Sequence, residues 1–210
     1  TAGFHMAEPQ GIWKAYTADF YRMDAYYRRF HLCFQRSLRQ SHPELDDLFK
    51  QVVDKVEGLY THWFLGQLAQ NWSNVCAEAL ETHGYIPGIP QQTNVYRDKV
   101  RDSENRIFVI VSDALRYEVA ATLAEELQRD MQCKVALGSQ EGIFPTATKY
   151  GMAALLPHKA LSVVLRSNDT LAVLADGQPT DAGNRDKVLK TANPKSVALK
   201  YDDILSLIHI

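Results

Sequence analysis

The fold class is decided by the stretch Ile107-Phe108-Val109-Ile110-Val111-Ser112-Asp113-Ala114-Leu115-Arg116-Tyr117-Glu118. Its first five residues are β-branched or aromatic, with no polar residue among them. Such a run is typical of a strand that is buried on both faces of a parallel sheet. A helix is predicted to follow over residues 114–130, because four apolar residues share one helical face, namely Leu115, Val119, Leu123 and Leu127.

Strands and helices continue to alternate beyond this helix. Further strands are predicted over residues 134–137, 161–165 and 171–174, and a further helix over residues 148–156. This alternation is the signature of an open α/β sheet. No Gly-x-Gly-x-x-Gly motif follows the run at 107–111, which argues against a nucleotide-binding Rossmann domain. We therefore assign residues 101–204 to an α/β core with parallel strands.

Residues 1–100 have a different, helical pattern. Large apolar side chains recur at alternating spacings of three and four, at Trp13, Tyr16, Phe20, Met23, Tyr27, Phe30 and Phe34. This spacing predicts one apolar face of a helix, which must be packed against something, and residues 45–68 carry a second apolar face. A ligand groove would show the same pattern, although core packing is the commoner reason for it. The Pro- and Gly-rich stretch at 83–90 predicts the end of the helical region.

Composition excludes several classes of function. The formal net charge of −2 does not support a basic nucleic-acid-binding surface or a polybasic membrane anchor. No run of 18 apolar residues and no apolar leader occur, so we expect a cytoplasmic protein without a membrane partner. Three widely spaced cysteines are interpreted as reduced, buried thiols.

Both ends of the sequence suggest an internal fragment. The first residue is Thr1, and residues 205–210 resemble the in-frame translation of a transposon-end sequencing adapter. We therefore exclude these six residues, His209 included, from any set of ligands. The alternative is that residues 204–210 form an apolar strand.

Asp113 is the first candidate site residue. It follows directly after the predicted strand at 107–111, and open parallel sheets bind ligands outside the carboxyl ends of their strands. A carboxylate in this place could bind a hard cation or a polar substrate. Position alone equally allows Asp113 to cap the helix that follows.

The second candidate is the loop Phe144-Pro145-Thr146-Ala147-Thr148-Lys149-Tyr150-Gly151. A hydroxyl at the start of a helix lies near free backbone N–H groups, which favour phosphate. A metal ion beside the hydroxyl would lower its pKa and make it a nucleophile. Capping of the helix by Thr146 or Thr148 is the structural alternative.

Taken together, Asp-Ala-Leu-Arg-Tyr-Glu after a strand and the later Pro-Thr-Ala-Thr-x-Tyr-Gly resemble the PglZ domain of the alkaline phosphatase superfamily. The pattern is most similar to the type A PglZ proteins of BREX phage-defence systems, which also carry a long helical region before the core. The resemblance implies a truncated alkaline-phosphatase-like parallel sheet, with the helical region over 1–100 and the first part of the core over 101–204.

The resemblance also implies a site with two divalent metal ions, usually zinc. Asp113 matches the first metal-ligand aspartate of the superfamily, and Thr148 matches the nucleophile and a metal ligand, with Thr146 in reserve. Arg116 and Lys149 flank these positions and could contact phosphate, although each could equally be a solvated helix residue. Further Asp and His ligands of the superfamily lie well downstream of the pattern matched here.

The expected function is thus metal-dependent phosphoryl transfer, as a phosphatase or phosphodiesterase, in a BREX-type phage-defence system. The expected partners are other BREX proteins and a phosphorylated substrate, which could be a nucleic acid. The alternative is a non-catalytic interaction or scaffold module of the same complex. On either reading this sequence by itself is expected to be inactive.

Overall fold

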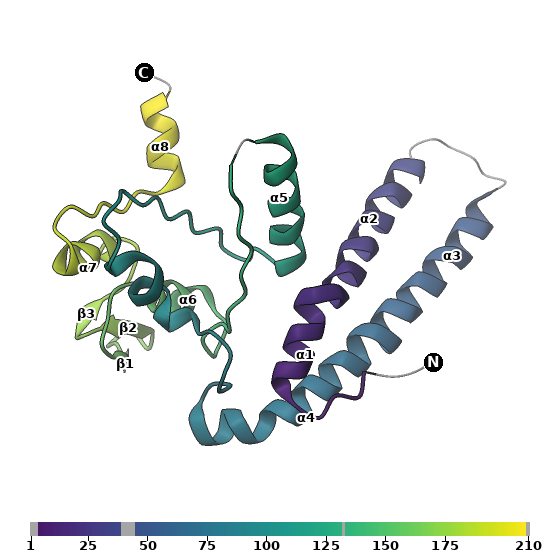
Figure 1. Cartoon of the computed structure of the whole chain (residues 1–210), viewed down its shortest axis with the longest axis horizontal. Coiled ribbons are helices and arrows are strands. Elements are labelled where there is room, and N and C mark those ends of the chain that lie inside the picture. The colour runs from purple at the N-terminus through teal and green to yellow at the C-terminus, as the bar shows by residue number, and fades with distance from the viewer. Residues whose placement is uncertain (1–3, 39–44, 132, 209–210) are drawn as a thin grey trace. The chain divides into compact units, whose positions relative to one another are not determined.

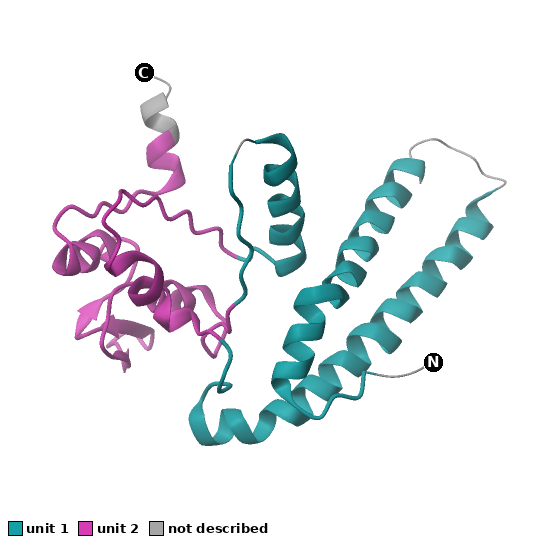
Figure 2. Cartoon of the chain, in the orientation of Figure 1, with its two compact units in different colours: residues 1–89, 114–139 teal, residues 90–113, 140–210 magenta. Residues whose placement is uncertain are grey.

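The structure, a computed structural model, describes residues 4–38, 45–131 and 133–208 (Figure 1). The chain divides into two compact units (Figure 2). Unit 1 comprises residues 1–89 and 114–139, and unit 2 comprises residues 90–113 and 140–210. Each unit is described below by itself.

Unit 1 is helical, as predicted for the N-terminal region. One continuous helical segment consists of α1 (Pro9–Ala15), the π-helical turn η1 (Tyr16–Phe20) and α2 (Tyr21–Leu38). A second consists of α3 (Asp46–Gly58), the π-helical turn η3 (Leu59–Leu65) and α4 (Gly66–His83). The helix α5 (Tyr117–Asp130) completes the unit. The chain leaves α4 at Gly84, whose φ of 73° is readily adopted only by glycine.

Two apolar clusters hold the helices of unit 1 together. Ile12, Phe64 and Leu68 form the first, and Cys76, Ile86 and Ile89 form the second. The predicted apolar stripe packs partly against them, since Tyr16 and Phe20 contact the first cluster and Trp13 the second. Six of the seven stripe residues are half-buried and Met23 is exposed, so the stripe packs beside the core without being fully buried in it.

The interpretation of the cysteines as buried thiols is right for one of them. Cys76 is buried, whereas Cys33 and Cys133 are exposed, and all three are free thiols.

Unit 2 contains short helices and a small sheet. The helical elements are the 3-10 turn η4 (Gln92–Asn94), the π-helical turn η5 (Tyr96–Arg101), α6 (Thr148–Ala154), α7 (Arg185–Ala192) and α8 (Tyr201–Ile208). The strands β1 (Leu161–Leu165), β2 (Leu171–Ala175) and β3 (Gln178–Pro179) lie in the order β1-β2-β3. Leu156, Ala175 and Val188 form a core in which α7 packs on the sheet.

The strands of this sheet are antiparallel, whereas parallel strands were expected. β1 pairs with β2 from Leu161 opposite Ala175 to Leu165 opposite Leu171, and β2 pairs with β3. The reason is the short connection, residues 166–170, since a parallel crossover needs about a dozen residues or more. The predicted strands at 161–165 and 171–174 are themselves confirmed.

Two other predicted strands are not formed in the structure. Residues 107–111 belong to no helix or strand of the described chain, and Phe108 and Ile110 are 81% and 91% exposed. Residues 134–137 are likewise outside any strand. A strand requires a neighbour to satisfy its backbone groups, and composition alone does not supply one.

The C-terminal residues form a helix through Ile208, so the alternative of a strand over 204–210 is wrong for residues 204–208. Residues 209 and 210, including the excluded His209, lie outside the described part of the chain.

Asp176 and Gly177 make the tight turn between β2 and β3, with φ values of 48° and 81°. Two successive residues with positive φ are the requirement of a type I′ hairpin turn. The Asp176 carboxylate accepts hydrogen bonds from the backbone N–H groups of Lys159 and Ala160 at 2.9–3.0 Å. These bonds, with that from Ala160 the largest cause, hold the pKa of Asp176 below its usual value.

We predict that Asp176→Asn makes the stability of this chain less sensitive to acid. Because the pKa is lower in the folded state, the stabilisation by Asp176 is present above the unfolded pKa of about 3.9 and is lost as the pH falls through the folded value. Asparagine tolerates the turn and does not titrate in this range. Urea unfolding at pH 6 and pH 3 should show a smaller loss of unfolding free energy in the variant. Equal losses in both proteins would contradict this account.

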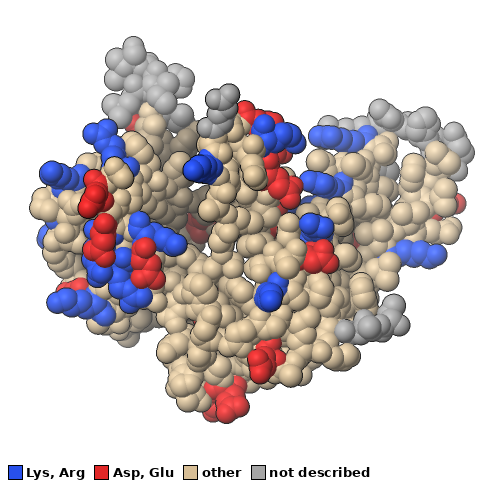
Figure 3. Space-filling view, in the orientation of Figure 1, with Lys and Arg blue, Asp and Glu red and all other residues tan. Residues whose placement is uncertain are grey.

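Charged side chains of both signs are interspersed on the face that Figure 3 shows. Several arginines pair with the acid that follows them, such as Arg97 with Asp98 at 2.8 Å and Arg101 with Asp102 at 2.9 Å. In the part of the chain that the structure describes, no helix combines the length and apolar character needed to cross a membrane.

Candidate functional site

The structure brings Asp113 and Thr148 together within unit 2. Thr148 Oγ1 donates a hydrogen bond to Asp113 Oδ2 at 2.9 Å, and both residues are exposed. They are 35 positions apart in the sequence, so the contact is made by the fold and not by local chain geometry. Two oxygen ligands that could bind the same cation therefore lie side by side at the surface.

Neither residue acts as a helix cap, so both capping alternatives are wrong. Helix α5 begins only at Tyr117, and its N-cap residue is Arg116 instead of Asp113. Helix α6 has Ala147 at its N-cap position and no side-chain cap hydrogen bond, and Thr148 is its first residue. The polar side chains of Asp113 and Thr148 are thus directed to each other.

The backbone immediately after Asp113 is strained. Ala114 has a φ of 57°, in the left-handed region that costs a residue with a Cβ atom roughly 1–2 kcal/mol. Strain of this kind is concentrated at functional sites, where the surrounding structure imposes it. The surrounding structure therefore holds the backbone after Asp113 in a conformation that Ala114 would not adopt by itself.

The Asp113–Thr148 pair fits part of a metal site but does not complete one. Two oxygen ligands bound to a tetrahedral zinc ion at about 2.1 Å lie roughly 3.4 Å from each other. Thr148 Oγ1 and Asp113 Oδ2 are 2.9 Å apart, so they would have to move apart only slightly to bind the same ion. Among the residues that the structure describes, no group of three or more His, Cys, Asp or Glu side chains is placed to hold a metal ion. The pair could therefore supply two oxygen ligands to a metal ion.

Lys149 lies next to Thr148 and is exposed. Its Nζ is 3.5 Å from the Leu171 carbonyl oxygen and 5.1 Å from the centre of the Tyr150 ring. These contacts are weak, so the ammonium group could turn towards an anion. Its role as a substrate contact stays a prediction.

Arg116 pairs with two buried carboxylates in unit 1, although its own side chain is 57% exposed. Its Nε lies 2.9 Å from Glu118 Oε1, and its Nη2 lies 3.7 Å from Asp24 Oδ1. Arg28 Nε also lies 3.1 Å from Glu118 Oε1. Because Glu118 is only 1% exposed, these guanidinium groups neutralise a carboxylate that would otherwise be costly to bury. Arg116 thus has a structural role in pairing with Glu118 and Asp24. Its predicted contact with phosphate stays a prediction.

Two tyrosines from the π-helical turns complete the network. Tyr16 of η1 and Tyr60 of η3 each donate a hydrogen bond of 2.6 Å to Asp24. Burial, together with the hydrogen bond to Asp24, raises the pKa of Tyr60 to about 12. The same causes raise the pKa of Tyr16. Both phenols are therefore neutral donors at physiological pH.

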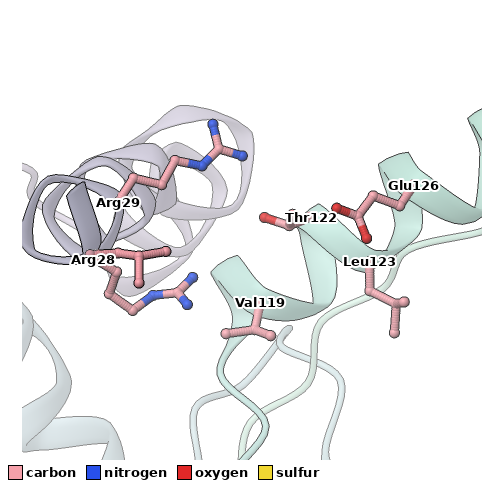
Figure 4. Close-up of a pocket in the computed structure, with 7 residues that line it drawn as sticks. Arg28, Arg29, Val119, Thr122, Leu123 and Glu126 are labelled. Carbon is pink, nitrogen blue, oxygen red and sulfur yellow. The ribbon is translucent and has the colours of Figure 1, made fainter. Parts of the chain in front are cut away.

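A pocket of about 360 Å³ lies between α2 and α5 in unit 1 (Figure 4). It is lined by apolar and charged side chains, namely Arg28, Arg29, Leu32, Val119, Thr122, Leu123 and Glu126. It does not include any of the residues predicted for the site.

One residue near the site gave no signal in the sequence. Gln92 bonds through its side-chain amide to Ile143 and Gly151, which lie on either side of the loop that carries Thr148. It belongs to no recognisable motif, and its partners are 51 and 59 positions away. Only the three-dimensional structure could reveal this contact.

Comparison with known proteins was made at the level of families, curated proteins and solved structures. The family model described as the BREX system PglZ alkaline phosphatase-like domain matches residues 92–209. The chain is 38% identical over 212 residues to the alkaline phosphatase-like protein BrxZ of Escherichia coli O9:H4 (strain HS), covering 98% of this chain and 24% of BrxZ. It is 32% identical over 204 residues to the alkaline phosphatase-like protein PglZ of Bacillus cereus (strain H3081.97), covering 96% of this chain and 23% of that protein. No solved structure is a significant match.

The chain thus spans about a quarter of the length of the curated relatives it matches. The family match covers more than half of the chain and includes both Asp113 and Thr148. The chain therefore belongs to the PglZ family of BREX system alkaline phosphatase-like domains.

Proposed function

We propose that the whole protein, a chain of the relatives' length that carries this sequence, is a metal-dependent phosphoryl-transfer hydrolase. It would act as a phosphatase or phosphodiesterase in BREX-type phage defence. The observation that supports this most directly is the 2.9 Å hydrogen bond between Thr148 Oγ1 and Asp113 Oδ2. It joins the two residues whose types and order match the nucleophile and first metal ligand of the superfamily.

In this proposal Asp113 and Thr148 hold one of two divalent metal ions, with zinc as the expected metal. When bound, the metal ions lower the pKa of the attacking hydroxyl and neutralise charge on the transferred phosphoryl group. The hydrogen bond to Asp113 keeps Thr148 Oγ1 beside the carboxylate. The hydroxyl proton would be lost to solvent and replaced by a metal ion held by both oxygens, and Oγ1 could then attack phosphorus in line. The exposure of Thr148 allows a phosphate ester to reach it.

The substrate is proposed to be phosphorylated, with nucleic acid among the candidates, and the partners to be other BREX proteins. Lys149 is the better placed of the two proposed phosphate contacts, because it directly follows Thr148 in the chain. Arg116 would have to bind phosphate while its guanidinium also pairs with Glu118.

We also infer that residues 107–111 form a buried strand of a parallel sheet in the whole protein. Apolar side chains as exposed as those of Phe108 and Ile110 form a surface that a soluble protein normally covers. A strand in this place would end at Asp113, and the carboxyl end of a parallel strand is where such sheets bind ligands.

The 210-residue chain alone is predicted to bind zinc weakly and to hydrolyse no phosphate ester. Its described residues provide two of the oxygen ligands, whereas a catalytic zinc site needs about three protein ligands. Calorimetric titration with zinc and assays with chromogenic phosphate mono- and diesters would test this. Thr148-dependent turnover by this chain would contradict it.

The same assays applied to the whole protein test the proposed function. Hydrolysis that disappears on chelation and returns with zinc supports an enzyme. A whole protein that is folded and metal-loaded but inert towards both ester classes would favour the scaffold alternative.

A further inference from the structure

The loop that carries Thr148 has few packing contacts of its own. Residues 144–149 are all exposed to solvent. An exposed loop samples many conformations unless something fixes its ends. A nucleophile on such a loop must nevertheless stay close to Asp113, because reacting groups lose effectiveness when they are displaced by about 1 Å.

The side chain of Gln92 fixes both ends of this loop within unit 2. The backbone N–H of Ile143, just before the loop, donates to Gln92 Oε1 at 3.1 Å. Gln92 Nε2 in turn donates to the carbonyl oxygen of Gly151, in helix α6, at 3.2 Å. One amide group therefore bridges the residues on either side of Thr148.

Gln92 is itself held by the backbone. Its N–H donates to the carbonyl oxygen of Glu141 at 2.9 Å, and the Glu141 N–H donates to the carbonyl oxygen of Pro90 at 2.7 Å. These bonds belong to an isolated parallel bridge between Gln91 and Glu141. The amide thus extends from a fixed piece of backbone instead of from a free surface side chain.

The chemistry of the contact requires an amide. One partner is an N–H donor and the other is a carbonyl acceptor, so the bridging group must accept at one atom and donate at the other. A carboxylate of the same size could only accept, and a shorter side chain would not reach both partners. Two glycines of this region lie beside the amide, since a Cβ at Gly151 would be 3.4 Å from Gln92 Nε2 and one at Gly142 would be 3.8 Å from Gln92 Oε1.

We propose that Gln92 is a positioning residue for the Thr148 hydroxyl, an inference that rests on the proposed function. By tying Ile143 to Gly151, the Gln92 amide holds the loop in the conformation in which Thr148 faces Asp113. Gln92 does not touch the reacting atoms and acts only through the loop.

The first test measures turnover by the whole protein. Gln92→Ala should lower kcat for a chromogenic phosphate ester by about 10²-fold with little change in KM, because the hydroxyl is displaced while substrate contacts remain. Gln92→Glu should also lower kcat, since a carboxylate cannot donate to Gly151. Gln91→Ala is the matched control, because the Gln91 side chain accepts a long, 3.5 Å hydrogen bond from its near neighbour Thr93 Oγ1. Unchanged kcat in both Gln92 variants of an active enzyme would overturn the proposal.

The second test needs no activity and uses the 210-residue chain. Amide hydrogen exchange at Ile143 should become at least about tenfold faster in Gln92→Ala than in the Gln91→Ala control, while the amides of β1 and β2 keep their protection. Uniform loss of protection across unit 2 would show that Gln92 only stabilises the fold. Unchanged exchange at Ile143 would show that the Gln92 side chain does not restrain the backbone of Ile143. Either result would overturn the positioning role of Gln92 whether or not Thr148 is the nucleophile. The failure of this proposal can therefore be distinguished from the failure of the proposed phosphoryl-transfer function.

Discussion

Thr148→Ala is expected to reduce metal-dependent hydrolysis of phosphate esters by the whole protein about 10⁴-fold or more, since removing a nucleophile has effects of this size in other hydrolases. The reason is that the Thr148 hydroxyl, which donates to Asp113 Oδ2 at 2.9 Å, is the proposed nucleophile and alanine has no hydroxyl to replace it. The side chain is exposed, so the unfolding free energy should change by only about 1 kcal/mol. Steady-state assays with saturating zinc, together with urea unfolding, measure the two quantities.

The chain offers a matched control and a direct competitor for this substitution. Thr170 is also an exposed threonine whose hydroxyl donates to a side chain, Asn168 Oδ1, at 2.6 Å, so Thr170→Ala should retain activity. Thr146→Ala decides between the two candidate nucleophiles. If Thr146→Ala abolishes hydrolysis and Thr148→Ala does not, the nucleophile is Thr146. Full activity in the Thr148 variant would remove Thr148 from the mechanism.

Phe108→Ala should have a very different effect on stability in this chain and in the whole protein. Phe108 is 81% exposed here, so the substitution should change the unfolding free energy by no more than about 0.5 kcal/mol. If residues 107–111 become a buried strand in the whole protein, the same substitution should cost about 3–5 kcal/mol there.

Phe64→Ala is the internal reference for this comparison. Phe64 is 0% exposed and lies in the core of unit 1, so its loss should cost about 3–5 kcal/mol in both proteins. The denaturant dependence of hydrogen exchange, followed in peptides that cover 107–111 and 59–65, gives a separate stability for each segment. An equally small effect of Phe108→Ala in both proteins would show that this segment is not a buried strand.

Local patterns in the sequence predicted the elements that depend on local interactions. The spacing of apolar residues from Trp13 to Phe34 predicted a helix, and helical hydrogen bonds are made within the segment itself. The two strands of the hairpin were also predicted, over 161–165 and 171–174, but their relative direction was not. The short connection at 166–170 indicates an antiparallel pair. The prediction of parallel strands came instead from the alternation of strands and helices over the whole of residues 101–204.

The wrong and missing predictions concern interactions with distant parts of the chain. Residues 107–111 have the composition of a strand, but a strand exists only with neighbours, and the described residues provide none. For the site, the order of two motifs predicted that Asp113 and Thr148 belong to the same site. In the structure Thr148 Oγ1 lies 2.9 Å from Asp113 Oδ2. No pattern in the sequence indicated the hydrogen bonds from Gln92 to Ile143 and Gly151. Glutamine is common at surfaces, and both partners contribute backbone atoms, which every residue type has.

The position of the metal ion in the whole protein is the most direct test of a shared cation site. Crystals of the zinc-loaded whole protein, measured at the zinc absorption edge, would locate each zinc ion by its anomalous scattering. We predict a zinc ion within about 2.0–2.2 Å of an Asp113 carboxylate oxygen and of Thr148 Oγ1. Zinc bound only to other residues, with Asp113 and Thr148 still hydrogen bonded to each other, would contradict the proposal.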